Sequence, residues 1–259
     1  MSGRVERGLR DAVMGTWLEP PARFLWKRVL HRKSRNDLYD DLTATVMRRT
    51  LGRASNGIDV GCHGGLILDE MLRLAPEGSH LAFEPLPDLA AELRRKYAGR
   101  PNVTVHELAL SQTSGTATFH ANRSHPAMSG LQRRDDLGAR DRVERLQVRT
   151  ERLDALVGPD RRIDFVKVDV EGAESLVFEG ARECLTRDRP IVVFEHGEPS
   201  RTSYGADAAR VHDLLASCGL AVSLLDEFLR GGAPLTRGAL GEQVDRGLNF
   251  YFVAHPPQG

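Results

Sequence analysis

The sequence predicts an α/β fold in which a doubly wound, mostly parallel sheet is covered by helices on both faces. Three observations support this prediction. Short apolar runs recur along the chain, and most of them are bounded by Gly, Pro or Asp, as buried strands are. Helix-like stretches lie between these runs. The alternation continues for roughly 200 residues, which is the pattern of a parallel sheet built from strand-helix-strand units.

The apolar runs give the expected strands, and the stretches between them give the expected helices. In chain order, the strands are expected at Ile58–Val60, Leu81–Phe83, Val103–Val105, Phe165–Val170, Ile191–Phe194, Ala221–Leu225 and Phe250–Val253. The helices are expected at Leu66–Leu74, Asp88–Tyr97, Ala173–Leu185 and Asp207–Cys218. With 259 residues and 41% hydrophobic side chains, the chain is long and apolar enough for one large domain.

Two segments stand apart from this alternation. Residues 1–55 are polar and helix-like, so we expect an N-terminal helical extension ahead of a domain at residues 56–259. The extension is basic and contains Trp17 and Trp26, which suits a membrane surface, but a dimer contact or a helical lid is favoured. Residues 111–150 read as an insertion with short strands at Thr116–Phe119 and Leu146–Arg149.

Charge and cysteine content restrict the class of protein. Lys plus Arg and Asp plus Glu both number 36, so a generic nucleic-acid binder with a basic field is not expected. No apolar run approaches the ~20 residues that span a bilayer, and the N-terminus lacks the apolar core of a secretory signal. Three widely spaced cysteines argue against a disulfide framework. We therefore expect a cytoplasmic protein.

A nucleoside site is expected where the first two strands end. The first strand runs into a turn with Gly61, Gly64 and Gly65, and glycine lets a ligand approach the backbone closely. Glu84 ends the second strand, where a carboxylate can accept hydrogen bonds from both hydroxyls of a ribose. The glycine spacing does not match the dinucleotide fingerprint, and no P-loop is present. These mismatches favour an adenosine ligand other than NAD or ATP.

Acidic side chains gather at the ends of two later strands. Asp169 and Glu171 follow one strand, and Glu195 and His196 end the next, so all four are expected to face one cleft at the carboxyl edge of the sheet. Buried carboxylates are costly unless they are paired or bind a metal, which indicates a shared purpose. Lys167, within the strand, is expected to pair with a neighbouring acid.

These segments resemble the FkbM-type S-adenosylmethionine-dependent methyltransferases. The resemblance covers residues 56 to 198, and Tyr251–Ala254 fits the last strand of that family. His63 stands where the family often has Asn, and the extension is not covered. The residues that carry the resemblance are Asp59-Val60-Gly61-Cys62-His63-Gly64-Gly65, Phe83-Glu84-Pro85, Ala109-Leu110-Ser111, Phe165 to Glu174, and Arg189 to Glu195.

The resemblance implies a Rossmann-like class I methyltransferase fold with seven strands, the last of them antiparallel. It implies that S-adenosylmethionine binds at the glycine turn, with Gly61 and Gly65 lining the methionine part, His63 beside them, and Asp59 supporting the turn or the amino group. Glu84 would hold the ribose, and Glu107 and Leu108 would lie beside the adenine. The family methylates mainly hydroxyl oxygens, often on sugars or natural products.

Two devices could activate such a hydroxyl. His196 suits a general base because its ordinary pKa is near neutrality. Asp169 and Glu195 suit Mg²⁺, which would lower the pKa of the hydroxyl, and Glu171 lies between them in sequence. The carboxylates could instead only accept hydrogen bonds from loop amides. In the insertion, contacts with the acceptor or a solvated loop are equally expected for His125, Ser129, Gly130, Arg133 and Arg134.

The leading hypothesis is an O-methyltransferase that acts on a small-molecule or glycan acceptor. An NAD(P)-dependent oxidoreductase is a second hypothesis, because Glu84 would serve the same ribose role there. A third is a catalytically silent S-adenosylmethionine-binding scaffold, although the carboxylates at the sheet edge are more chemistry than a scaffold needs.

Overall fold

A computed structural model describes residues 34–125, 128–131, 141–197 and 208–257. The chain divides into two compact units, Met1–Asp41 and Leu42–Gly259. Helix α3 (Arg35–Thr50) confirms the helical segment expected in the extension. The unit with the sheets begins at Leu42, earlier than the boundary expected at 55/56, because Val46 and Met47 are fully buried in its core. Trp17 and Trp26 lie outside the described residues.

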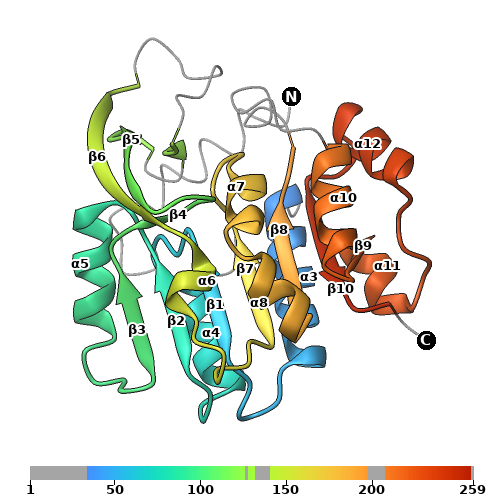
Figure 1. Ribbon diagram of the computed structural model, residues 1–259, viewed down its shortest axis with the longest axis horizontal. Helices are drawn as coiled ribbons and strands as arrows, with labels where there is room; N and C mark the ends of the chain where they lie inside the picture. Colours follow the sequence, from blue (N-terminus) through green and yellow to red (C-terminus); the bar gives the residue numbers. More distant parts are fainter. Residues whose placement is uncertain (1–33, 126–127, 132–140, 198–207, 258–259) are drawn as a thin grey trace, which may run out of the picture. The chain divides into compact units, whose positions relative to one another are not determined.

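The main sheet has seven strands in the order β3-β2-β1-β7-β8-β10-β9 (Figure 1). Neighbouring strands from β3 to β8 pair in parallel, whereas β10 is antiparallel to both β8 and β9. The expected doubly wound, mostly parallel sheet with an antiparallel last strand is confirmed. Its strands are β1 (Gly57–Val60), β2 (His80–Phe83), β3 (Val103–His106), β7 (Phe165–Val168), β8 (Ile191–Glu195), β9 (Ala221–Leu224) and β10 (Tyr251–His255).

Alternating side chains of these strands enter two separate cores. Ile58, Val168 and Phe194 pack on one face against helices that follow the later strands. Phe165 and Val193, from alternate positions, pack on the other face. The first face is covered by α6 (Leu153–Leu156), α7 (Glu174–Glu179), α8 (Arg182–Asp188), α10 (Ala208–Ser217) and α12 (Arg237–Asp245). The second is covered by the end of α3, α4 (Leu66–Leu74), α5 (Pro87–Lys96) and α11 (Leu225–Arg230).

One expected helix, Ala173–Leu185, is broken into α7 and α8. The break falls at Gly180, where an added Cβ would lie 2.1 Å from the carbonyl oxygen of Ser111. The Asp154 carboxylate then accepts hydrogen bonds from the backbone N–H groups of Glu183 and Cys184, at 3.2 and 3.0 Å, which satisfies the start of α8. Both contacts come from segments distant in sequence, so the local pattern could not show the break.

The insertion forms part of a second, three-stranded sheet. Its order is β4-β6-β5, with β4 (Ala109–Leu110) parallel and β5 (Gly115–Asn122) antiparallel to β6 (Val143–Glu151). Both expected short strands are therefore present but longer than expected. Figure 1 shows β5 and β6 beyond the carboxyl end of β3. Among the described residues, no helix combines the length and the apolar character needed to cross a membrane.

Candidate active site

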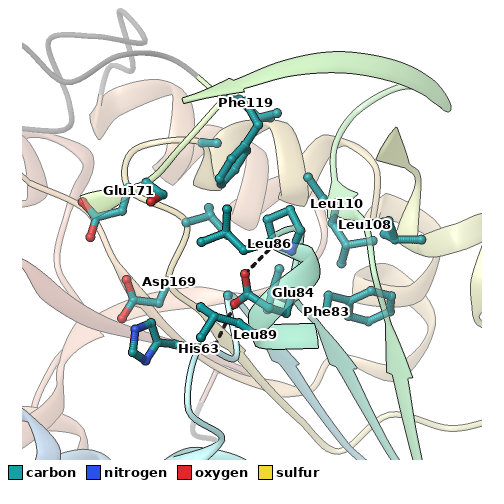
Figure 2. Close-up of a pocket in the computed structure, with 18 residues that line it drawn as sticks. His63, Phe83, Glu84, Leu86, Leu89, Leu108, Leu110, Phe119, Asp169 and Glu171 are labelled. Carbon is teal, nitrogen blue, oxygen red and sulfur yellow. Dashed lines mark hydrogen bonds between the residues drawn. The ribbon is translucent and has the colours of Figure 1, made fainter. Parts of the chain in front are cut away.

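A pocket of about 590 Å³, its open mouth included, lies at the carboxyl ends of β1, β2 and β7. One wall comes from the second sheet and its connection, through Phe119, Ser129 and Leu131. The other walls come from the turn after β1, the end of β2, the segment after β3 and the turn after β7. Figure 2 shows side chains from these segments converging on one space.

Glu84 lies at one end of the pocket with its carboxylate oriented by the backbone. The N–H of His63 donates to Oε2 at 2.9 Å, and the N–H of Leu86 donates to Oε1 at 3.0 Å (Figure 2). Burial raises the pKa of Glu84, and these two backbone donors oppose the rise. Each carboxylate oxygen keeps further acceptor capacity, because a carboxylate offers about four lone-pair sites. The site therefore presents a preoriented acceptor for two hydroxyl groups.

Apolar side chains surround the space beside Glu84. Leu108 and Leu110 follow β3, and Phe83 and Phe119 lie on strands of the two sheets. Leu108 lines the pocket, and its place beside the adenine stays a prediction. Glu107 does not line the pocket, because its side chain is partly exposed and forms an ion pair with Arg94 at 2.8 Å.

The glycine turn brings β1 and β7 into backbone contact. Gly61 has φ +78°, and an added Cβ would lie 1.9 Å from the carbonyl oxygen of Asp169. Gly61 and His63 line the pocket. Gly65 does not: it begins α4 with φ +77°, and an added Cβ would lie 2.4 Å from the Tyr97 hydroxyl. The geometry therefore gives Gly65 a structural reason for being glycine.

Asp59 lies in β1 on the opposite face of the sheet from Val60, which lines the pocket. Within the described residues, its Oδ2 is buried without a hydrogen-bond partner. Burial raises the pKa of Asp59 to about 6, partly offset by a hydrogen bond with Cys62 and the charge of Lys167. Asp59 does not itself line the pocket.

Three carboxylates meet at the other end of the pocket. Asp169, Glu171 and Glu195 each place an oxygen within 4.8 Å of the others. Asp169 and Glu171 line the pocket, and Glu171 adopts the left-handed φ of +56° that is uncommon for a residue with a side chain. Figure 2 shows both carboxylates on the side of the pocket away from Phe83. The structure thus brings three of the four expected groups together.

A lysine and a tyrosine neutralise and orient this cluster. Lys167 Nζ lies 3.0 Å from Asp169 Oδ2, which confirms the expected ion pair, and the Tyr251 hydroxyl donates to the same oxygen at 2.6 Å. Burial would raise the pKa of Asp169, but Lys167, Tyr251 and Glu195 together hold it below its ordinary value. Burial, then the charges of Asp169 and Glu171, raise the pKa of Glu195 to about 10. Glu195 is therefore protonated near neutral pH.

The expected approach of His196 to the cleft is corrected by the structure. His196 follows Glu195 directly, so its side chain lies on the opposite face of the sheet. The imidazole is buried, and its Nδ1 lies 3.5 Å from Oε2 of Glu174 in α7. Glu174 Oε1 in turn accepts the N–H of Gly172 at 2.9 Å. His196 and Glu174 thus support the turn after β7 without lining the pocket.

The insertion residues are divided in their placement. Ser129 lines the pocket, which is where a residue that contacts the acceptor would have to lie. His125 is largely exposed and contacts Asp141 at 3.0 Å, and Gly130 pairs with His120 on β5. Arg133 and Arg134 lie outside the described residues.

Several residues near the pocket were not anticipated. Phe119 and Leu131 are ordinary apolar positions of the insertion, and only the fold of the second sheet brings them over the pocket. Tyr251 begins the last strand and reaches Asp169 because β10 pairs with β8. Its register partner is Glu195, so strand alternation alone could have placed both on the same face.

The chain matches a known protein family over the residues that form this pocket. The model of the FkbM methyltransferase domain matches residues 59–220, a range that includes the glycine turn, Glu84, Asp169 and Glu195. The chain belongs to the FkbM methyltransferase family. This membership favours a methyltransferase over the oxidoreductase considered from the sequence.

Two curated relatives and one solved structure illustrate the likeness. The 2-O-methyltransferase NoeI of Sinorhizobium fredii is 27% identical over 190 residues, covering 67% of this chain and 74% of NoeI. The AMB antimetabolite synthetase AmbE of Pseudomonas aeruginosa is 29% identical over 213 residues, covering 68% of this chain but 10% of AmbE. A methyltransferase FkbM from Methylobacillus flagellatus KT gives a TM-score of 0.48 at 13% identity, covering 79% of this chain and 44% of that one.

Proposed function

We propose that this methyltransferase moves a methyl group from S-adenosylmethionine to a hydroxyl oxygen of a small-molecule or glycan acceptor. The observation that carries the proposal is a single pocket with a backbone-oriented carboxylate, Glu84, at one end and a carboxylate cluster at the other. The likeness to NoeI, a 2-O-methyltransferase, supports oxygen as the methylated atom.

The cofactor would lie along the pocket with its ribose on Glu84. Both ribose hydroxyls would donate to Oε1 and Oε2, which the backbone already orients. The adenine would pack among Leu108, Leu110 and Phe119. The methionine part would then run past Gly61, toward Asp169.

Methyl transfer is an in-line displacement, so alignment of the acceptor oxygen, the methyl carbon and the sulfur does most of the work. As the O–C bond forms and the C–S bond breaks, the hydroxyl proton must leave. In this proposal Asp169 accepts that proton, because it is an ionised carboxylate that lines the pocket and is held in place by Lys167 and Tyr251. Glu171 would hold a neighbouring group of the acceptor. His196 has no direct part, since its ring is buried against Glu174 and does not line the pocket.

A divalent metal is a second device that the donor set fits. Asp169 and Glu195, with Glu171, would hold Mg²⁺ through carboxylate oxygens. A bound Mg²⁺ would supply a lower pKa for the acceptor hydroxyl. It would have to displace the proton on Glu195 and share Asp169 with Lys167. Full turnover in excess chelator, with no metal in the purified protein, would exclude this device; loss of turnover that Mg²⁺ restores would establish it.

Binding and turnover test the proposed function in two steps. Calorimetric titration with S-adenosylmethionine, S-adenosylhomocysteine and NADH should show binding of the first two and not of NADH. Incubation with methyl-labelled cofactor and a panel of free sugars, oligosaccharides and hydroxylated amino acids should then add one methyl group to an acceptor, as seen by mass spectrometry. Binding without transfer to any acceptor would favour the silent scaffold, and binding of NADH alone would refute the proposal.

A further inference from the structure

The carboxylate of Asp169 is held by two side chains that do not themselves line the pocket. Lys167 comes from the same strand, β7, and Tyr251 comes from β10, on the far side of β8. Both contact Oδ2, at 3.0 and 2.6 Å. The Lys167 ammonium also lies 4.6 Å from the centre of the Tyr251 ring. Two donors therefore hold one oxygen of a carboxylate that faces the ligand space.

The backbone of Asp169 is fixed as firmly as its side chain. Its N–H donates to the carbonyl oxygen of Val60 at 2.9 Å, and its own carbonyl lies against Gly61. Asp169 is thus anchored at the end of the pocket that the glycine turn forms, away from the apolar side chains proposed to hold the adenine. With the backbone fixed, the remaining freedom is the side-chain rotamer, which Lys167 and Tyr251 select.

We propose that Tyr251 is a positioning residue for methyl transfer: together with Lys167, it aims the Asp169 carboxylate at the place where the transferring methyl group lies. This inference rests on the proposed function. A hydroxyl that donates to a carboxylate makes a strong, directional hydrogen bond. A charge held in place before the reaction stabilises the transition state without a cost of reorganisation at that moment. Removing the hydroxyl should therefore weaken the effect of Asp169 at the reacting centre without emptying the pocket.

Two cofactor analogues can measure this effect without a known acceptor. S-adenosylhomocysteine has a neutral thioether, whereas sinefungin carries an amine, protonated near neutral pH, in the place of the methylated sulfonium. The ratio of their dissociation constants therefore reports the field of Asp169 at the methyl position. In Tyr251→Phe we expect sinefungin to bind about tenfold more weakly, while S-adenosylhomocysteine changes by less than about twofold.

Matched variants of the full chain are measured by calorimetry with the same two ligands. Tyr39→Phe makes the same deletion on α3, where the hydroxyl contacts Arg35, and should change neither constant. Lys167→Gln keeps a donor beside Asp169 but removes a positive charge that opposes the carboxylate's field, so sinefungin should bind no more weakly in this variant. Asp169→Asn removes the field itself and should show the full selective loss, which keeps the test valid if Tyr251→Phe does not fold. Equal weakening of both ligands would show a merely structural role, and no change would also overturn the inference. If the wild type binds neither ligand, the proposed function itself fails.

Discussion

The two ends of the pocket are built in different ways. At the Glu84 end, the carboxylate is oriented by backbone N–H groups from the two adjoining turns and is surrounded by apolar side chains. At the Asp169 end, the carboxylate is oriented by the side chains of Lys167, from the same strand β7, and of Tyr251, from β10. Backbone donors are fixed by the turn itself, whereas the side-chain donors depend on strand pairing across the sheet.

This difference separates binding from chemistry. Among the described residues, the Glu84 end offers carboxylate acceptors and apolar surface, which suits a nucleoside that must be held and released. The Asp169 end concentrates an ionised and a protonated carboxylate beside an ammonium group, which suits bond changes at a charged sulfur. Variants at the first end should mainly change cofactor affinity, and variants at the second should mainly change turnover.

The largest effect is expected at Gly61, where the turn after β1 meets the backbone of Asp169 after β7. Gly61→Ala would place a Cβ 1.9 Å from the Asp169 carbonyl oxygen and strain a residue at φ +78°. Because the collision is with backbone, we expect a loss of stability of about 4 kcal/mol or more. Thermal unfolding should show it beside Gly64→Ala, where nothing lies within 4 Å of the added Cβ. Equal melting temperatures for both variants would contradict the close approach of β1 and β7.

Asp169→Asn should lower turnover through the Asp169 end of the pocket alone. The amide keeps the shape of the side chain but removes the charge that Lys167 and Tyr251 orient, and it cannot accept a proton as a carboxylate does. We expect kcat to fall about 10²–10⁴-fold, with the dissociation constant for the neutral product S-adenosylhomocysteine changed far less. The acceptor found in the panel provides the assay, and Asp160→Asn, at an exposed position before β7, is the control. Loss of cofactor binding in parallel with kcat would remove the distinction between the two ends.

Glu84→Gln should weaken cofactor binding at the Glu84 end of the pocket alone. A glutamine amide would direct donor hydrogens at either His63 N–H or Leu86 N–H, and it removes charge-assisted bonds to the ribose. We expect about 10–100-fold weaker binding of S-adenosylmethionine, and the same factor for adenosine, which carries the ribose but no methionine. Glu107→Gln, at a partly exposed ion pair, should leave both constants unchanged. A loss for the whole cofactor without a loss for adenosine would move Glu84 away from the ribose.

The sequence predicted the geometry of the Glu84 end of the pocket better than that of the Asp169 end for a physical reason. Glu84 and the glycine turn are separated by about one strand-helix unit, so local patterns are enough to bring them to one edge of the sheet. The Tyr251 contact to Asp169 joins residues 82 positions apart, through a strand order that no local pattern contains. Likewise, the packing of Gly180 against Ser111 divides a helix that is continuous in its apolar spacing.

His196 shows an expectation that the sequence itself could have refined. Placing Glu195 and His196 in one cleft ignored the fact that successive residues of a strand point to opposite faces. Phe194 packs in the first core and Val193 in the second, so Glu195 shares its face with Val193 and His196 does not. Strand period therefore separates His196 from Glu195 and from the face that Lys167 and Tyr251 share. The contact of His196 with Glu174, in helix α7, is shown only by the structure.

The smallest effect is expected at Asp59, beneath the glycine turn, and it concerns stability rather than turnover. Its pKa of about 6 in the folded chain lies above the ordinary value of 3.8, so the folded state binds more protons between these pH values. The wild type should therefore lose stability as pH rises from about 4 to 6, by up to about 3 kcal/mol in total. Above pH 6 this group should cause no further loss.

Asp59→Asn should abolish that pH dependence and unfold at a higher urea concentration than the wild type at pH 8. The expected gain in stability is about 1–2 kcal/mol, less than the full cost of the buried charge, because a buried amide also needs hydrogen-bond partners. Asp88→Asn, at a largely exposed aspartate, should follow the wild type at every pH. If Asp59→Asn instead loses stability equally at pH 5 and pH 8, Asp59 Oδ2 has a partner that stabilises the ionised carboxylate. The pKa of Asp59 would then not be raised by burial, and this prediction would be wrong.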